Sequence, residues 1–458
     1  MSPEEFRKFA HEAVDWMADY LAHSETYPVL PHVKPGELTD ALPRCGPEHG
    51  EPMSAILADF RNKIVPAATH WNHPGFMAYF AISASGPGIL GEMLTATLNM
   101  NGMLWKTSPA VVELEQVALD WLRRWIGLPD GLFGIIFDTA STSSMHAIAA
   151  AREMVAPEVR TDGGGSGLVI YTSEQSHSSI EKGAIAIGIG QKNVRKIPVD
   201  GEYRMRPDAL AAAIEQDQAA GLRPFCVVAT VGTTSTTSID PVEQIAPIAE
   251  RYGAWLHVDA AYAGVAAVAP ELQHILRGCE RADSLVTNPH KWLFTPVDIS
   301  ILYTRRPEIL RRAFSLVPEY LRTADDPRAT NYMDYGVPLG HRFRALKLWF
   351  VLRYYGREGL AGMIRNHIGW AQELAAQIDA HGHFERTAPT RFSTICFRFK
   401  GTDEENRNIL ERVNASGQVF LSHTVLRGQY CLRLAIGNMK TTREHVQRAW
   451  ELVQSAAG

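Results

Sequence analysis

The chain has 458 residues, and 45 Lys and Arg against 50 Asp and Glu give it a net charge of −5. A protein that binds nucleic acid or a membrane surface would carry a basic excess or a basic patch, so neither partner is expected. Hydrophobic residues at 46% and charged residues at 21% are typical of a globular protein, and they exclude global disorder and a coiled coil.

Five Cys are spread widely along the chain without a Cys-x-x-Cys motif. We therefore expect neither a disulfide framework nor a Cys-rich zinc site, and no metal site is predicted. The first six residues are acidic and lack the pattern of a secretory signal. No apolar run approaches the length of about 20 residues that spans a bilayer. These features predict a soluble, cytoplasmic protein of enzyme size.

The chain begins with a predicted amphipathic helix. A capping-box pattern at Ser2 and Glu5 is followed by apolar residues at helical spacing from Phe6 to Tyr20. Residues 26–52 are rich in Pro, Gly and His and are predicted to be an extended connection. Because no core lies nearby in the sequence, the helix packs its apolar face either on a partner subunit or on its own chain, and both remain open.

Short apolar runs alternate with helical patterns between residues 138 and 305. Residues 168–171, 225–229 and 255–258 are predicted to be buried strands, and 241–252 a crossover helix. This alternation indicates βαβ units and a mostly parallel sheet with helices on both faces. Ligands of such sheets bind at the carboxyl ends of the strands.

The remaining segments are less regular. The polar segment 317–336 has no clear periodicity, and long loops of this kind are often functional lids. Residues 340–355 are predicted to be helical, and strand-like runs at 394–399 and 430–436 indicate a small α+β C-terminal domain. The glycine run at 163–167 is interpreted as a flexible turn.

Two residues of opposite charge carry the chemistry. Lys291 follows a predicted strand at 284–286; taken alone, it is best explained as a solvated surface residue. Asp259 ends a buried apolar run, where a carboxylate needs a cation as its partner. A lysine that captures an aldehyde and an aspartate that keeps a pyridine nitrogen protonated are the groups that pyridoxal 5′-phosphate requires.

The motifs Asn288–Trp292 and His257–Gly264 together resemble the group II pyridoxal-phosphate decarboxylases, and within them the aromatic-L-amino-acid decarboxylases. The resemblance covers nearly the whole chain, from Trp71–Pro74 to residues 445–451. It implies an α/β fold of the fold type I pyridoxal-phosphate-dependent transferases, which is similar to aspartate aminotransferase. A mostly parallel central sheet would be flanked by helices.

The resemblance also implies the division of the chain. We expect a helical N-terminal arm at 1–82, swapped between the subunits of a homodimer. A large cofactor-binding domain at 83–347 and a small α+β domain at 348–458 would follow. The active sites would be shared between the two subunits.

The resemblance assigns the cofactor site to strand ends and helix starts. His177 would stack on the cofactor ring opposite Ala261, with Thr234 nearby, while Lys291 and Asp259 hold the aldehyde and the ring nitrogen. Without the resemblance, each residue outside the Lys291–Asp259 pair is better explained as a cap, turn or core residue. The phosphate side is predicted to comprise Thr139, Ala140, Ser141, Ser284, Asn288 and His290.

Tyr320 lies in the polar loop, and the resemblance implies that this loop closes over the neighbouring subunit's site. The family reaction runs through an external aldimine and a quinonoid, and the tyrosine then protonates the substrate carbon. A phenol with an ordinary pKa near 10 can donate to so basic a carbon. His177 and Tyr320 favour simple decarboxylation by a carboxy-lyase. An aromatic acetaldehyde synthase and an inactive cofactor-binding relative remain the alternatives.

The substrate side implied by the resemblance is apolar and suits a flat aromatic ring. It comprises Trp71, Tyr79, Phe80, Ile82, Met103, Leu104 and Gly340. Family members with Gly at the position of Gly340 tend to accept indoles, which favours tryptophan or 5-hydroxytryptophan, although relatives with Gly also take DOPA. Tyrosine and phenylalanine are the other candidate substrates. Animal enzymes carry Thr where this chain has Ile82, and the lost hydroxyl puts recognition of a catechol or of the substrate carboxylate in doubt.

Overall fold

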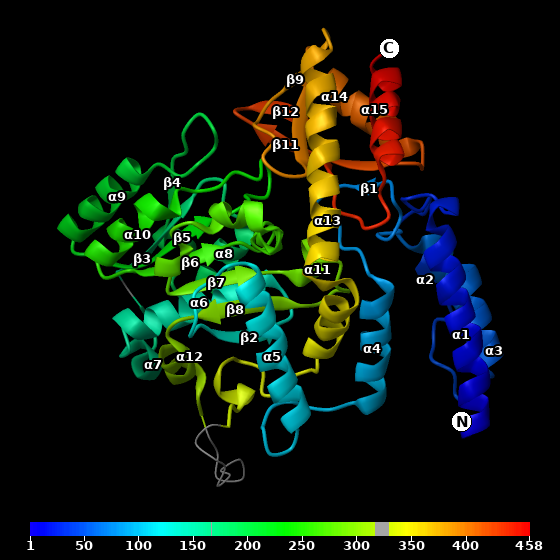
Figure 1. The fold of residues 1–458 in the computed structure, drawn as a ribbon, viewed down its shortest axis with the longest axis horizontal. Helices are drawn as coiled ribbons and strands as arrows, with labels where there is room; N and C mark the ends of the chain where they lie inside the picture. Colours follow the sequence, from blue (N-terminus) through cyan, green and yellow to red (C-terminus); the bar gives the residue numbers. More distant parts are fainter. Residues whose placement is uncertain (166, 317–328) are drawn as a thin grey trace. The chain divides into compact units, whose positions relative to one another are not determined.

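The computed structural model describes residues 1–165, 167–316 and 329–458. These residues form two compact units, coloured along the chain in Figure 1. The terminal unit comprises residues 1–81 and 398–458, and the central unit comprises residues 82–397. The division into domains at 1–82, 83–347 and 348–458 stays a prediction. Within the described ranges, no helix is both long and apolar enough to cross a membrane.

The central unit is built on a sheet whose described strands follow the order β2-β8-β7-β6-β5-β3-β4. Its pairs are parallel, except that β8 is antiparallel to both of its neighbours. The predicted mostly parallel sheet is confirmed. The strands are β2 (Phe133–Phe137), β3 (Leu168–Ser173), β4 (Val194–Ile197), β5 (Arg223–Thr230), β6 (Trp255–Asp259), β7 (Ser284–Thr287) and β8 (Ser300–Thr304).

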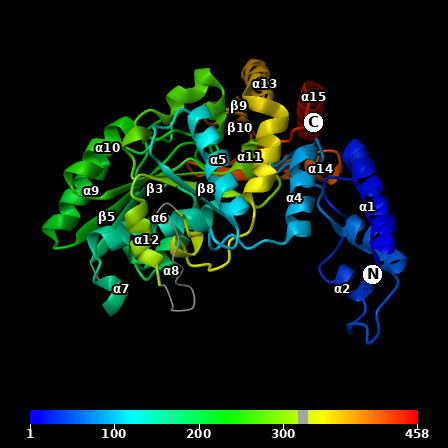
Figure 2. The same cartoon turned by 60° about the horizontal axis from the view of Figure 1, so that its bottom comes forward.

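Helices connect and cover these strands. Apolar residues of α6 such as Ile148 pack in one core with Ile170 of β3 and Val228 of β5, while α9 and α10 lie side by side in both views (Figures 1 and 2). The helices are α4 (Gly86–Leu98), α5 (Pro109–Trp125), α6 (Ala140–Val155), α7 (Val159–Asp162), α8 (Ser178–Ala186), α9 (Pro207–Ala219), α10 (Val242–Arg251), α11 (Pro289–Trp292), α12 (Pro307–Phe314) and α13 (Ala345–Ala380). Strands β9 (Phe384–Arg386) and β10 (Thr394–Phe399) follow α13.

Helix α13 corrects the prediction of a helix that starts at residue 340. Residues 340–344 are not helical, because the His341 N–H donates to the Asn101 side chain (2.9 Å) and the His341 carbonyl accepts from Gly102 N–H (2.7 Å). Gly356, with φ 64° and ψ 174°, interrupts the helix and joins two helical segments. A positive φ of this kind is tolerated by glycine because it has no Cβ.

The terminal unit contains α1 (Pro3–His23), α2 (Glu37–Ala41), α3 (Met53–Asp59), β1 (Phe76–Met77), α14 (Asp403–Ala415), β11 (Phe420–Leu426), β12 (Gln429–Ala435) and α15 (Arg443–Ala457). The predicted capping box is present: Ser2 N–H donates to Glu5 (2.7 Å) and Glu5 N–H donates to Ser2 (3.1 Å). Strand β1 is parallel to β11, and β11 and β12 form an antiparallel hairpin. Helix α2 lies inside the stretch predicted to be extended.

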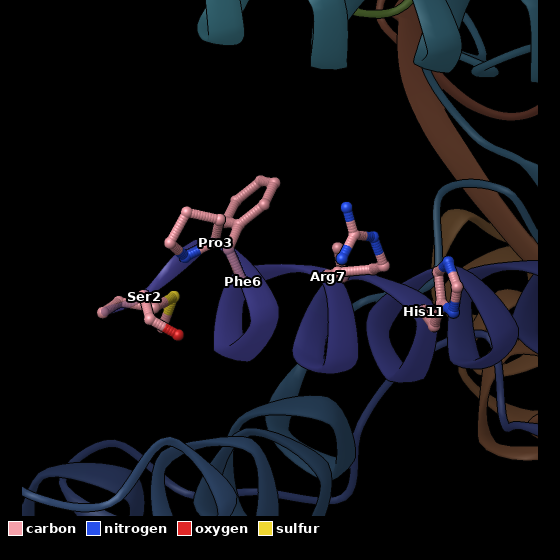
Figure 3. Close-up of a pocket in the computed structure, with 7 residues that line it drawn as sticks. Ser2, Pro3, Phe6, Arg7 and His11 are labelled. Atoms are coloured by element: carbon pink, nitrogen blue, oxygen red, sulfur yellow. The ribbon is translucent and has the colours of Figure 1, made fainter.

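Helix α1 keeps an exposed apolar face. None of its residues is buried; Phe6 is 62% and Val14 41% exposed. In Figure 3, Pro3, Phe6 and Arg7 point to the same side of the helix. This end of α1 borders a hollow lined by Met1, Ser2, Pro3, Phe6, Arg7, Ala10 and His11.

Candidate functional site

The carboxyl ends of five strands meet at one edge of the central sheet. Strands β2, β3, β5, β6 and β7 run in the same direction, and their ends are neighbours: Thr230 pairs with Asp259, and Asp259 with Val286. Each strand is followed by predicted site residues, which the fold therefore gathers at this edge. They are Thr139, Ala140 and Ser141 after β2, His177 after β3, Thr234 after β5, Asp259 and Ala261 at the end of β6, and Asn288, His290 and Lys291 after β7.

Asp259 is a buried carboxylate, only 6% exposed. Its Oδ1 accepts the Ala261 N–H (3.1 Å), and the Ala261 carbonyl accepts the Asn288 N–H (3.1 Å). These bonds tie the loop after β6 to the loop after β7. Since an anion at this depth is costly without a cation, Asp259 is arranged to pair with a positively charged ligand group.

Lys291, Asp259 and His177 lie within electrostatic reach of one another. Desolvation lowers the pKa of His177, although the residue is exposed. The positive charge of Lys291 lowers this pKa further, and the negative charge of Asp259 raises it. The His177 Nδ1 accepts the Ser179 N–H (3.2 Å) at the start of α8, so the proton of the neutral ring is assigned to Nε2. His177 is therefore a neutral donor near an amine and a carboxylate.

The start of α6 offers donors to an anion. The first intrahelical bond is donated by Ser143 N–H to the Thr139 carbonyl (3.0 Å). The N–H groups of Ala140, Ser141 and Thr142 therefore have no acceptor within the helix, and they stand at its positive end. A phosphate group is a suitable ligand for such a helix start.

His290 and Asn288 supply further donors. Burial lowers the pKa of His290 to about 3, so its ring is neutral. The His290 Nδ1 accepts the Ile299 N–H (2.9 Å), which assigns the ring proton to Nε2, 3.3 Å from the Asn288 amide. The amide oxygen is the better partner for that proton, and this orientation leaves the Asn288 NH₂ group for a ligand.

Hydrogen bonds connect the start of α6 to the Asn288 and His290 side chains. Ile299 bonds to His290, and the next residue, Ser300, bonds through its hydroxyl to Ser143 of α6 (2.7 Å). The buried Asn288 side chain also keeps one oxygen or nitrogen atom without a hydrogen-bond partner among the described residues. An unsatisfied buried amide beside a helix start fits a phosphate group as its ligand.

Ser284 does not belong to this edge. It lies at the amino end of β7, paired with His257, and its hydroxyl accepts the Trp255 indole N–H (2.8 Å) and contacts His257 Nδ1 (2.8 Å). Because the hydroxyl is already used inside the core, we leave Ser284 out of the proposed phosphate site. The serine spacing in the motif did not reveal which end of the strand the residue occupies.

His257 is a residue whose part in the site the sequence did not reveal. It lies two positions before Asp259, on the same face of β6, and its Nε2 contacts the Ser144 hydroxyl of α6 (3.1 Å). It thereby connects the strand that carries Asp259 to the phosphate-side helix. The signal was present, because His257 opens the motif that ends in Gly264.

The predicted substrate-side residues fall in both units. Trp71, Tyr79 and Phe80 belong to the terminal unit, whereas Ile82, Met103, Leu104 and Gly340 belong to the central unit. Tyr320 lies outside the described residues.

Within each unit, the contacts are specific. In the terminal unit, Trp71 stacks on Phe76 with ring centroids 4.2 Å apart, and Arg433 lies over the Phe80 ring at 4.7 Å. In the central unit, the Asn101 side-chain oxygen accepts N–H groups from Met103 (3.2 Å) and from His341 (2.9 Å). Asn101 thus holds the loop of Met103 beside Gly340.

The buried histidines of the central unit predict that the protein loses stability in acid. Burial lowers the pKa of His257 and of His146 to about 4 and that of His290 to about 3. The unfolded chain takes up these protons near pH 6.5 and the folded chain does not, so the free energy of unfolding should fall as pH falls from 6.5 towards 4. His257 alone should account for about 2 kcal/mol between pH 7 and pH 5.

Urea unfolding at pH 7, 6 and 5 measures this effect. His257→Gln should make the pH dependence shallower, while His49→Gln, at an exposed position, should leave it unchanged. An equal slope for His257→Gln and the unsubstituted protein would contradict the assignment of a neutral His257.

Comparisons with known proteins agree with this geometry. Residues 35–400 match the model of the pyridoxal-dependent decarboxylase conserved domain. A phenylacetaldehyde synthase of Arabidopsis thaliana is 41% identical, with 100% of this chain and 96% of the relative covered. An aromatic-L-amino-acid decarboxylase of Catharanthus roseus is 40% identical, with 99% and 94% covered.

A solved structure shows the same fold. The Oryza sativa TDC with PLP and tryptamine superposes with a TM-score of 0.97 at 37% identity, covering 100% of this chain and 98% of that one. The expected fold and the expected cofactor are confirmed. The chain belongs to the pyridoxal-dependent decarboxylase family, whose cofactor is pyridoxal phosphate.

Proposed function

We propose that the protein decarboxylates an aromatic L-amino acid to the arylalkylamine and carbon dioxide. The observation that carries the proposal is the convergence of Lys291, Asp259 and His177 at the strand edge that also holds phosphate donors. The aromatic class is supported by relatives at about 40% identity that are named for aromatic amino acids or their aldehydes.

The chain's residues have distinct parts in this reaction. When bound, pyridoxal phosphate supplies an aldehyde carbon and a cationic ring that takes up electrons. The N–H groups of Ala140 and Ser141, with Asn288 and His290, hold the phosphate. Asp259 would keep a proton on the ring nitrogen, and the Lys291 amine would hold the aldehyde.

The remaining residues orient the ring and the substrate. His177 would pack on one face of the ring as a neutral imidazole and Ala261 on the other, with Thr234 near His177. Met103, Leu104 and Gly340 of the central unit border the aromatic side chain. The substrate roles of Trp71, Tyr79, Phe80 and Ile82 stay predictions from the sequence.

The deciding experiment is a product assay. The protein is incubated with tryptophan, 5-hydroxytryptophan, DOPA, tyrosine, phenylalanine and glutamate, and amine, aldehyde and peroxide are quantified. An aromatic amine as the main product is expected, with tryptophan or 5-hydroxytryptophan turned over best. Turnover of glutamate alone would rule out the aromatic class.

An aromatic acetaldehyde synthase is the second candidate, because a relative with 41% identity carries the name phenylacetaldehyde synthase. Aldehyde with stoichiometric peroxide as the main product would favour this candidate. Tyr320, proposed as the donor of a proton to the substrate α-carbon, decides the partition. Tyr320→Phe should shift products from amine towards aldehyde in the same assay, and an unchanged amine-to-aldehyde ratio would disprove this role of Tyr320.

We also infer a homodimer with shared active sites. The exposed apolar residues Phe6 and Val14 of α1 support a partner that covers them. Figure 3 shows Phe6 at the hollow beside the start of this helix. Light scattering that gives the mass of two chains is the expected result, and the mass of one chain would contradict it. The cytoplasmic location stays a prediction from the sequence.

A further inference from the structure

Lys347 is a buried lysine that the reaction proposed above does not use. It lies in the first turn of α13, and its side chain is only 1% exposed. A lysine is almost never this deeply buried unless it is paired, because desolvation of the ammonium is costly. Its position therefore calls for a specific explanation.

The closest anionic partner is Glu92 of α4. The two helices approach tightly at Gly91, where an added Cβ would come within 2.7 Å of Lys347 Cα (Figure 1). Glu92 Oε2 lies 2.9 Å from Lys347 Nζ, but not at a hydrogen-bonding angle, so Nζ has no hydrogen-bond acceptor among the described residues. Glu92 also pairs with Arg342.

The surrounding charges leave a net positive cluster. Besides Lys347, Glu92 and Arg342, it contains Arg344, which binds Asp298 through two hydrogen bonds (3.1 and 3.2 Å). Three cations and two carboxylates give 3 − 2 = +1. Desolvation lowers the pKa of Lys347 to about 8; Asp298 opposes that shift, and Arg342 and Arg344 add to it. Only Lys347 of this cluster is fully buried, and a net positive charge around a buried lysine favours the binding of an anion.

This cluster is connected to the proposed phosphate donors through Asp298 and His290. Asp298 directly precedes Ile299, whose N–H fixes the tautomer of His290 (2.9 Å). The charge of Lys347 also reaches His290, because it helps to lower the pKa of that ring. The charge of Lys347 therefore acts on a ring that belongs to the proposed phosphate site.

We propose that Lys347 is a positioning residue of the cofactor phosphate site, acting through Asp298 and His290. Its charge offsets the phosphate dianion from behind, and the Arg344–Asp298 contact keeps the Ile299 N–H on His290 Nδ1. The His290 Nε2–H then holds the Asn288 amide in the orientation that turns its NH₂ group to the phosphate. The role rests on the proposed phosphate site and adds to it a residue that no direct ligand contact would reveal.

The test compares pyridoxal phosphate with pyridoxal, which lacks only the phosphate. Equilibrium dissociation constants for both are measured on the full chain after cofactor removal. Lys347→Met keeps the length of the side chain and removes its charge. It should therefore raise the dissociation constant of pyridoxal phosphate by about tenfold relative to that of pyridoxal. Lys192→Met, at an exposed position, should leave that ratio unchanged.

Glu92→Gln changes the net charge of the cluster in the opposite direction to Lys347→Met. Removing the Glu92 carboxylate makes the cluster more positive, so it should strengthen the binding of pyridoxal phosphate relative to the binding of pyridoxal. If the Lys347–Glu92 pair is merely structural, each substitution should weaken the binding of both ligands equally. That result would overturn the proposal. If Lys347→Met fails to fold, the Glu92→Gln ratio decides the proposal alone: an increase supports it and no change overturns it.

A pH series gives a second readout. Between pH 7 and 9 the phosphate stays a dianion, so the preference of the unsubstituted protein for pyridoxal phosphate should fall as Lys347 loses its proton. The groups that face Lys347 are Glu92, Asp298, Arg342, Arg344 and the neutral His290. The preference of Lys347→Met should stay flat, and a parallel decline in both proteins would contradict the role of Lys347. An unsubstituted protein that does not prefer pyridoxal phosphate would instead disprove the phosphate site itself.

Discussion

Lys291→Ala should abolish turnover, by about 10⁴-fold or more, and remove the visible absorbance of lysine-bound cofactor. The amine of Lys291 is the group proposed to hold the cofactor aldehyde between turnovers, and alanine offers nothing in its place. The phosphate donors remain, so the variant should still bind pyridoxal phosphate, but without the covalent bond. Absorbance spectroscopy and amine quantification measure the two effects on the same sample.

The fold should survive this substitution because the neighbours of Lys291 anchor α11. Asn288, His290 and Trp292 are buried, and the Trp292 indole N–H donates to His367 (3.0 Å) while its ring stacks on Tyr262 at 4.9 Å. The thermal unfolding midpoint of cofactor-free Lys291→Ala should therefore match that of the cofactor-free parent. Lys192→Ala, at an exposed position, is the control with full activity and full absorbance. A variant of Lys291 that keeps the absorbance band would show that another amine holds the aldehyde.

The sequence predicted the strands that are buried on both faces. Residues of β3, β5 and β6 form near-continuous apolar runs, and such runs are typical of parallel strands covered by helices. Because the carboxyl ends of parallel strands meet at one edge, the positions of His177, Thr234 and Asp259 followed from the same pattern. Local apolar character and chain direction placed these residues at one edge, whereas the family resemblance selected His177 and Thr234 as site residues.

Features that depend on distant contacts were not predictable. The antiparallel insertion of β8 between β2 and β7 and the late start of α13 are set by partners far along the chain. Lys347 illustrates the same limit, because a lysine in an apolar helix gives no sign of the carboxylate on α4 that pairs with it. Ser284 was assigned to the phosphate side, but it lies at the amino end of β7. The spacing of residues in the sequence does not show which end of a strand a residue occupies.

Asp259→Asn should retain the cofactor and lower kcat by about 10³-fold. An asparagine keeps the size of the side chain and its bond from Ala261 N–H, but a neutral amide does not stabilise a proton on the ring nitrogen. The cofactor then takes up electrons poorly, and the loss appears in kcat rather than in phosphate binding. Steady-state kinetics with the best substrate, together with the cofactor dissociation constant, separate these effects.

Asp240 provides a matched control, because it is also a buried carboxylate close to the end of a central strand. Its two oxygens accept backbone N–H groups of Met205 (2.7 Å) and Thr230 (2.8 Å), and burial raises its pKa to about 7. Both oxygens of Asp240 are thus used by backbone N–H groups, whereas Asp259 lies at the edge of the sheet where the strands end at their carboxyl termini. Asp240→Asn should change the free energy of unfolding and leave the per-site kcat of the folded enzyme near that of the parent.

A cofactor analogue with a methyl group on the ring nitrogen isolates the electrostatic part of the Asp259 effect. Its ring is permanently cationic, so it needs no carboxylate to stay charged. If Asp259 acts by holding the ring proton, the analogue should restore much of the lost kcat in Asp259→Asn while giving no gain in the parent. If Asp259 only shapes the loop that carries Ala261, the analogue should leave the variant as slow as before, because a fixed charge on the ring does not rebuild a displaced backbone.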